Sequence, residues 1–167
     1  MGMPLARRST QLLLLAALTI SAGACRKKGT ELPSDDFIAA LRPLPTADDS
    51  LFDPGKLRGK PTLVLFASPT CSHCMVELPV AEKAAAAENA NMVAVFVVGG
   101  KKHAASVKQS KNLVSPVLVD EDGALRAKYN IKGVPYTIVL GPDGRAIEAF
   151  RGAQGEDVLR DALVDAR

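Results

Sequence analysis

The feature that most constrains the fold is an alternation of short apolar runs with helical patterns. Residues 62–66 and 92–98 are continuous apolar runs rich in β-branched side chains, a pattern typical of strands that are buried on both faces. Residues 72–89, between them, are rich in Ala, Glu and Lys and carry apolar side chains at helical spacing. This order predicts an α/β domain in which helices flank a central sheet.

The second half of the chain predicts six more elements. They are helices at 103–111, 124–129 and 154–166 and strands at 117–119, 136–140 and 146–150. Gly141-Pro142-Asp143-Gly144 separates the last two strands and is a strong turn signal, so we expect these strands to form an antiparallel hairpin. The sheet should therefore be mixed, with helices on its faces.

Residues 1–24 have the three parts of a secretory signal peptide. Arg7 and Arg8 precede the apolar run 12–20, and the small residues 21–24 follow it. The run is shorter than the roughly 20 residues that a membrane-spanning helix needs. We therefore expect an exported protein whose domain faces the periplasm or the exterior.

Cys25 follows the small residues directly. This arrangement resembles the lipobox of bacterial lipoproteins, in which the cysteine is lipidated and becomes the mature N-terminus, although Ala22 stands where that motif usually has Leu. Ordinary cleavage after Ala24 is the alternative, and it leaves Cys25 as an unpaired thiol in an oxidising compartment. We expect lipidation, which would anchor the chain in a membrane.

Residues 25–50 are rich in Lys, Pro, Asp and Thr, and we interpret them as the lipidated N-terminus and a flexible tether. Asp35 and Asp36 are candidate caps for one or two helical turns within this segment. One compact domain is predicted over residues 51–167. Without the two arginines of the signal peptide the formal net charge falls from +3 to +1. Nucleic acid is therefore not an expected partner.

Cys71 and Cys74 stand where a buried strand meets the start of a helix. At a helix N-terminus the unpaired backbone N–H groups and the helix dipole favour a thiolate, which is the form that attacks a disulfide. Cys71 is therefore the predicted nucleophile. Cys74 lies one turn later on the same side of the helix, where it can displace a mixed disulfide. Such a redox-active disulfide needs no cofactor.

His73 lies between the two cysteines. An imidazole near Cys71 can donate a hydrogen bond to the thiolate or act as a cation. Either effect stabilises the reduced form and makes the disulfide more oxidising, and about 30 mV of reduction potential corresponds to 1.4 kcal/mol. The alternative is a solvated histidine with no role in the chemistry.

Other interpretations of the cysteine pair have less support. A structural disulfide with this spacing closes a very short loop and stabilises the fold little. A zinc site would need two further ligands, and the only histidines are His73 and His103. We therefore predict no metal.

Around these cysteines the sequence resembles the TlpA/ResA branch of the thioredoxin-like proteins. The resemblance covers residues 51–167 and rests on three segments: residues 57–74, Glu77 with Pro79, and Gly133-Val134-Pro135-Tyr136-Thr137. It implies a thioredoxin-like fold and a disulfide oxidoreductase of the bacterial cell envelope. It also implies protein thiols or disulfides as substrates and a membrane redox partner.

The resemblance further implies roles for individual residues. Pro135 is expected to follow a cis peptide bond and to face the disulfide, while the backbone of Val134 pairs with a bound substrate peptide. Glu77 matches a helix glutamate that assists proton transfer at the thiols. Its alternative role is that of a surface carboxylate.

Departures from the family pattern bear on the chemistry. Ala67 and Thr70 stand where the family has tryptophans. Leu65 replaces the buried aspartate of thioredoxin, so that another group, for which Glu77 is the candidate, must handle the proton of the resolving thiol. The Ser-His dipeptide differs from the Gly-Pro of reductants and shares its histidine with DsbA-type oxidants. We favour a reductant, although His73 leaves the direction of electron flow open.

Two other functions on the same fold are alternatives. Sco-type copper-delivery proteins use a longer cysteine spacing and a late histidine, whereas no histidine follows His103 here. Peroxiredoxin-like peroxidases carry Pro-x-x-x-Thr-x-x-Cys, and Cys71 does not match that pattern. A non-catalytic binding domain with a vestigial motif is a third alternative.

Overall fold

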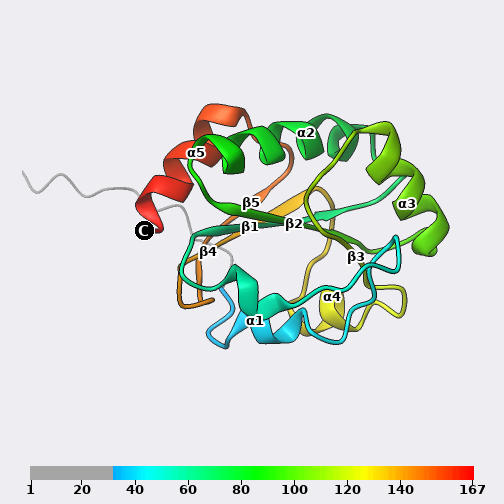
Figure 1. Cartoon of the computed structure of the whole chain (residues 1–167), viewed down its shortest axis with the longest axis horizontal. Coiled ribbons are helices and arrows are strands. Elements are labelled where there is room, and N and C mark those ends of the chain that lie inside the picture. The colour runs from blue at the N-terminus through cyan, green and yellow to red at the C-terminus, as the bar shows by residue number, and fades with distance from the viewer. Residues whose placement is uncertain (1–31) are drawn as a thin grey trace, which may run out of the picture.

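The computed structural model describes residues 32–167, and a five-stranded sheet with strand order β3-β2-β1-β4-β5 forms its centre. Helices cover both faces of this sheet (Figure 1). The predicted mixed α/β architecture is confirmed. The strands are β1 (Thr62–Ala67), β2 (Asn91–Phe96), β3 (Val117–Val119), β4 (Tyr136–Leu140) and β5 (Ala146–Arg151). The helices are α1 (Phe37–Ala40), the 3-10 helix η1 (Pro54–Leu57), α2 (Ser72–Ala87), α3 (Gly100–Ser110), α4 (Ala124–Lys128) and α5 (Glu156–Asp165).

The connections explain the mixed sheet. Helix α2 connects β1 to β2, and helix α3 connects β2 to β3. Each helix returns the chain to the end of the sheet at which the preceding strand began, so β1, β2 and β3 are parallel. Strand β4 pairs antiparallel with β1, and β5 forms the predicted hairpin with β4. The turn of this hairpin closes through a 2.9 Å hydrogen bond from Gly141 N–H to the Arg145 carbonyl. Gly144 has φ +86°, a conformation that favours glycine.

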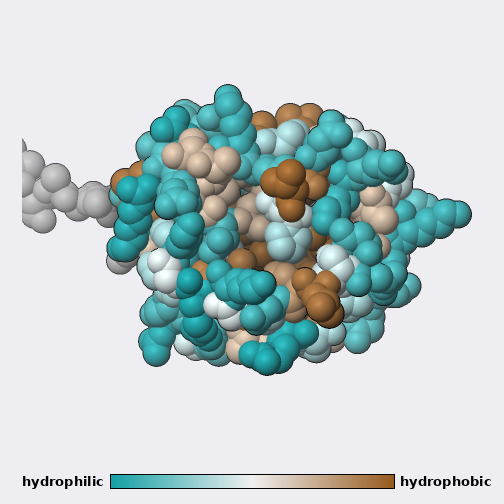
Figure 2. Space-filling model, viewed as in Figure 1, coloured by the Kyte–Doolittle hydropathy of each residue, from teal (hydrophilic) through white to brown (hydrophobic). Residues whose placement is uncertain are grey.

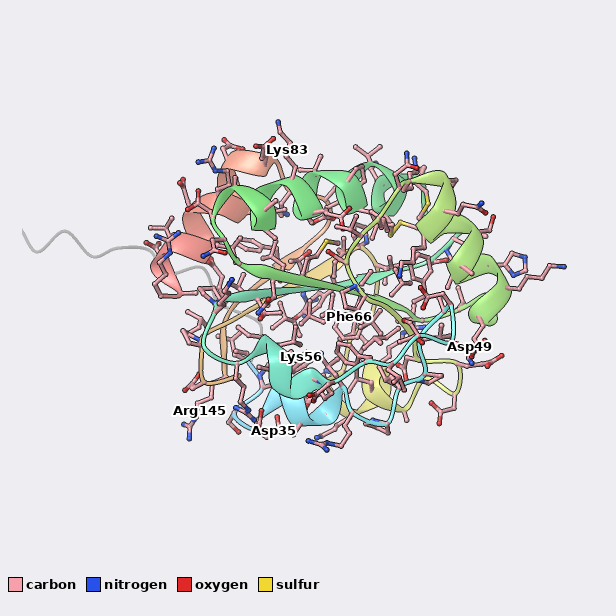
Figure 3. The ribbon with its side chains drawn as sticks, in the orientation of Figure 1. Asp35, Asp49, Lys56, Phe66, Lys83 and Arg145 are labelled. Atoms are coloured by element: carbon pink, nitrogen blue, oxygen red, sulfur yellow. A yellow bond between two sulfur atoms is a disulfide. The ribbon has the colours of Figure 1, made fainter. Side chains whose placement is uncertain are left out.

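Two apolar layers lie on opposite faces of the sheet, because successive side chains of a strand point to opposite sides. Leu63 and Leu65 of β1 pack toward α2 and α5, which lie above the sheet in Figure 1. Val64 and Phe66 pack toward α1 and α4 below it. Phe66 lies in this lower layer (Figure 3) and is fully buried. This two-sided burial explains why β1 is apolar from Leu63 to Ala67.

The segment before Leu51 differs from the expected tether. Phe37 and Leu41 have no exposed surface and belong to the lower apolar layer. Asp36 caps α1 by accepting a hydrogen bond from the Ala39 N–H, as the sequence suggested. The folded domain therefore begins before α1. The physical reason is that this part of the sheet would otherwise expose its apolar face to water.

Residues 45–47 extend the sheet beyond its edge strand. Thr46 forms an antiparallel bridge with Leu118 of β3. The Ala47 N–H donates to the Val117 carbonyl at 2.8 Å, and the Val119 N–H donates to the Pro45 carbonyl at 2.9 Å. These bonds satisfy backbone groups of β3 that an open edge would leave unpaired.

The surface shown in Figure 2 is mostly hydrophilic, with hydrophobic side chains gathered in a few separate places. Among residues 32–167 no helix is long and apolar enough to cross a membrane. The predicted signal peptide at 1–24 and the predicted lipidation site Cys25 lie outside the described residues.

Candidate active site

Cys71 and Cys74, the predicted active-site cysteines, lie at the junction of β1 and α2. A tight turn joins the two elements, closed by a 3.1 Å hydrogen bond from the Cys71 N–H to the Ser68 carbonyl. Pro69 and Thr70 occupy the centre of this turn. Helix α2 then starts at Ser72 with Cys71 as its N-cap and continues through Pro79. The turn thus places the Cys71 side chain over the helix N-terminus.

Cys71 and Cys74 form a disulfide with a Cα–Cα distance of 5.2 Å. The two sulfur atoms have different surroundings. Cys71 is partly exposed, whereas Cys74 has no exposed surface. The Cys74 N–H donates a 3.1 Å hydrogen bond to Cys71 Sγ, and a backbone donor at this place also stabilises a thiolate. An external thiol can therefore reach Cys71, while Cys74 is accessible only from within the molecule.

The segment before β4 lies against the disulfide. The Val134 carbonyl oxygen is 3.8 Å from Cys71 Sγ, and the Val134–Pro135 peptide bond is cis. Pairing of β4 with β1 brings this segment to the cysteines, because Tyr136 lies opposite Phe66 in the register. The structure thus brings both sequence-predicted groups, the cysteines and the Val-Pro pair, to one place.

Glu77 lies on α2, one turn after Cys74, and its side chain is buried. Its Oε1 accepts a 3.0 Å hydrogen bond from the Thr137 hydroxyl, while Oε2 has no hydrogen-bond partner among the described residues. Burial raises the pKa of Glu77, and the Thr137 hydroxyl and the backbone of Gln154 lower it to a smaller extent. Glu77 is therefore a buried carboxyl that holds its proton more strongly than an exposed one, and not a surface carboxylate.

Thr137 lies near the predicted site, and the sequence suggested no role for it. Thr137 stands opposite Leu65 in the β1–β4 pair, and Leu65 occupies the position of the buried aspartate of thioredoxin. A single threonine inside the otherwise apolar run of β4 was the available signal, because a buried hydroxyl requires a hydrogen-bond partner.

His73 lies in the first turn of α2, next to Cys74 in sequence. Its side chain is exposed, and it makes no hydrogen bond or ion pair with any residue from 32 to 167. The structure therefore places His73 next to Cys74 in the first turn of α2, without a hydrogen bond to Cys71.

The loop between β2 and α3, which contains Gly99, packs closely against Pro69 in the turn between β1 and α2. Gly99, just before α3, has φ +92°, and a Cβ atom built on it would lie 2.9 Å from Pro69 Cγ. Only a residue without a side chain allows the two loops to approach this closely. Gly99 is a second position that the sequence did not identify, although the Gly99-Gly100 pair is a recognisable breaker signal.

No group of three or more His, Cys, Asp or Glu side chains suited to a metal ion occurs within residues 32–167. Both described cysteines are in the disulfide. His103, the other histidine, lies close to the Gly99 carbonyl through its Nδ1 at 2.6 Å.

Comparison with known protein families identifies the family of this chain. The Redoxin family model matches residues 27–163. The chain belongs to the Redoxin family. This membership and the sheet topology confirm the thioredoxin-like fold and the resemblance found in the sequence.

Two relatives of this Redoxin chain are a protein named as a thiol-disulfide oxidoreductase and a protein named as a secreted antigen. Thiol-disulfide oxidoreductase ResA of Bacillus subtilis is 24% identical over 110 residues, which cover 64% of this chain and 62% of ResA. Soluble secreted antigen MPT53 of Mycobacterium tuberculosis is 32% identical over 103 residues, which cover 59% of this chain and 58% of MPT53. The match thus spans less than two thirds of either relative.

Solved structures share the fold. A secreted disulfide oxidoreductase of Mycobacterium tuberculosis, described as homologous to Escherichia coli DsbE, is 27% identical with a TM-score of 0.63, covering 73% of this chain and 93% of that one. A thiol:disulfide interchange protein of Chlorobium tepidum is 20% identical with a TM-score of 0.65, covering 73% and 90%. Thioredoxin-like oxidoreductases of this kind use a redox-active disulfide without a cofactor.

Proposed function

We propose that this chain is an extracytoplasmic thiol–disulfide oxidoreductase that exchanges disulfides with protein substrates through Cys71 and Cys74. One observation carries the proposal. A partly exposed Cys71 and a buried Cys74 form a disulfide at the start of α2, beside the cis Val134–Pro135 bond. The names of ResA and of the secreted Mycobacterium tuberculosis oxidoreductase support it.

In the reducing direction the Cys71 thiolate attacks one sulfur of a substrate disulfide. A Cys71–substrate disulfide forms, and the second substrate sulfur leaves as a thiolate and takes up a proton. The Cys74 thiol then loses its proton and attacks Cys71 Sγ, which releases the first substrate sulfur and closes the Cys71–Cys74 disulfide. Two electrons thus pass from the protein dithiol to the substrate, and the opposite sequence describes oxidation.

Glu77 is proposed to handle the proton of Cys74. Both side chains are buried and lie one helical turn apart on α2. Because its pKa is raised, the Glu77 carboxyl holds a proton to higher pH than an exposed carboxyl does, which suits a group that gives and takes up a proton. Val134 is proposed to offer its backbone to an extended substrate segment, and Pro135 to shape the groove.

We propose that the protein acts as a reductant. Within the described structure, Cys71 Sγ receives one backbone N–H and no hydrogen bond from His73, so few groups favour its thiolate. His73, exposed to solvent, would act only as a screened charge. The test is the reduction potential of the Cys71–Cys74 pair in glutathione or dithiothreitol buffers. We expect a value closer to about −270 mV, as in thioredoxin, than to about −120 mV, as in DsbA.

Activity is tested with single cysteine variants. Cys71→Ser should abolish disulfide reduction in a model protein substrate. Cys74→Ser should instead accumulate a mixed disulfide between Cys71 and the substrate, because the internal attack is lost. Full activity of Cys71→Ser would exclude the proposed function.

Export and anchoring are proposed from the sequence. Residues 1–24 would direct export, and lipidated Cys25 would hold the domain at a membrane where a membrane redox partner exchanges electrons with it. The secreted relatives support export. Mass spectrometry of the mature N-terminus tests the anchor. A Cys25→Ala variant should lose the acyl mass and leave the membrane fraction.

A further inference from the structure

A hollow of about 310 Å³ opens beside the cis Val134–Pro135 bond. Two segments line it, residues 132–136 and the pair Arg151-Gly152. Its lining contains two cationic side chains, Lys132 and Arg151, and no acidic residue.

The fold fixes both segments of this hollow. Arg151 stands opposite Tyr136 in the β4–β5 register, and the Gly152 N–H donates to the Pro135 carbonyl at 3.0 Å. On the other segment Ile131 is buried. Two hydrogen bonds to Arg126 hold the backbone of Ile131. The Ile131 N–H donates to the Arg126 carbonyl at 3.0 Å, and Arg126 Nε donates to the Ile131 carbonyl at 3.0 Å. Lys132 therefore follows an anchored residue.

Two acidic groups of the neighbouring elements, Asp35 and Asp120, have partners other than Lys132. Asp35 forms an ion pair with Lys128 at 2.7 Å and accepts a hydrogen bond from the Tyr129 hydroxyl. Asp120 accepts bonds from two N–H groups at the start of α4. Lys132 is exposed and makes no ion pair with any residue between 32 and 167. Its charge is thus not neutralised within the described domain.

The hollow is close to the reacting sulfur. The Val134 carbonyl lies 3.8 Å from Cys71 Sγ, and Lys132 precedes Val134 by two residues. Because an extended chain advances about 3.3 Å per residue, a substrate side chain one or two residues from the attacked cysteine can reach the hollow.

We propose that this basic hollow selects substrates with an acidic side chain one or two residues from the reacting cysteine. The proposal rests on the proposed function and adds a substrate preference to it. Lys132, which is exposed and makes no ion pair with the described residues, supplies the attraction. Because the site is exposed to solvent, the preference amounts to a few-fold in rate and weakens as salt screens the charges.

The test uses the full-length oxidised protein and three reduced peptides. Each peptide has one cysteine, and the peptides differ only at the residue two positions away, which is Glu, Gln or Lys. A peptide thiolate attacks Cys71 Sγ, forms a mixed disulfide and displaces the Cys74 thiolate. A second peptide thiolate then attacks the peptide sulfur of that mixed disulfide, which yields a peptide disulfide and the Cys71 thiolate. Acid quenching, alkylation and mass spectrometry of the Cys71–Cys74 segment give the rates.

We expect the Glu peptide to react about two- to fivefold faster than the Gln peptide, and the Lys peptide to react more slowly. Lys132→Gln should reduce the Glu-to-Gln rate ratio toward one, and Lys132→Glu should invert the order of the Glu and Lys peptides. The matched control is Lys56→Glu, which makes the same charge change on η1 (Figure 3), outside the hollow. It should keep the wild-type order.

Equal rates for the three peptides with the wild-type protein would overturn the substrate preference and leave the proposed function intact. An equal loss of preference in Lys132→Glu and Lys56→Glu would assign the effect to overall charge and would also overturn the proposal. Absence of exchange with any peptide would overturn the proposed function and this inference with it.

Discussion

The buried carboxyl of Glu77 on α2 accepts a 3.0 Å hydrogen bond from the hydroxyl of Thr137 on β4. This contact joins the helix that carries both cysteines to the strand that follows Pro135. In this chain Leu65 stands on the strand where thioredoxin has a carboxylate, and the buried carboxyl of Glu77 lies on the helix. Its burial raises the pKa of Glu77, with consequences for stability.

Replacing Glu77 with Gln should change how stability depends on pH. The ordinary pKa of this carboxyl is 4.5, and the folded state raises it. As the pH rises above 4.5, the unfolded chain loses this proton before the folded one does. The wild-type free energy of unfolding therefore falls relative to that of Glu77→Gln, by up to about 1.4 kcal/mol per pH unit, until the folded pKa is passed.

Urea denaturation of both oxidised proteins between pH 4 and pH 8 measures this difference. The Gln variant retains an acceptor for the Thr137 hydroxyl, so the comparison isolates the titration. A constant difference over the whole range would show that the pKa of Glu77 does not change on folding.

His73→Ala should make the active-site disulfide slightly less oxidising. Removal of an imidazole near Cys71 takes away a polar group that can favour the thiolate, so the reduction potential should become more negative. The shift should stay below about 30 mV because the side chain is exposed. Ser72→Ala, at the neighbouring exposed position, is the control. A shift of equal size in the control, or one toward positive potential, would contradict a role of His73 in the redox chemistry.

Gly99→Ala should slow thiol exchange at Cys71. A residue with a Cβ is strained at φ +92°, and that atom would lie 2.9 Å from Pro69 in the active-site turn. The control is Gly59→Ala, where φ is +84° and no atom lies within 4 Å of the added Cβ. Both variants should lose about 1–2 kcal/mol of stability from the backbone conformation. Only Gly99→Ala should lose more and also react more slowly with a small disulfide reagent.

Phe37→Ala should destabilise the domain by about 3–5 kcal/mol, the usual cost of removing a buried phenylalanine. The Phe37 ring packs at 4.4 Å from the Tyr129 ring and at 6.3 Å from the Phe66 ring, measured between centroids. Leu51→Ala, at a fully exposed leucine, should change stability by less than about 0.5 kcal/mol. Thermal or urea denaturation compares the two. Similar stabilities would mean that the segment around α1 behaves as a tether after all.

Local patterns in the sequence were sufficient for the elements and for their order. Apolar β-branched runs predicted β1 and β2, and the Gly-Pro-Asp-Gly turn predicted the β4–β5 hairpin. Cys71 and Cys74 could be placed at a helix start for the same reason, since the strand and helix signals meet there. These features depend on residues that are close together in the chain.

Contacts between distant parts of the chain were decided only by the tertiary structure. Whether Glu77 is a surface or a buried carboxyl depends on Thr137, sixty residues away, and the close approach of Gly99 to Pro69 depends on the packing of neighbouring loops. Residues 33–50 resemble a tether in composition, yet Phe37 and Leu41 cover a sheet face that the sequence alone could not show to be open. The sequence by itself predicted where the redox chemistry lies, at Cys71 and Cys74, and these residues form a disulfide in the structure. The fold determined the surroundings of that chemistry, because burial and charge depend on all the elements that pack around a group and not on its sequence neighbours.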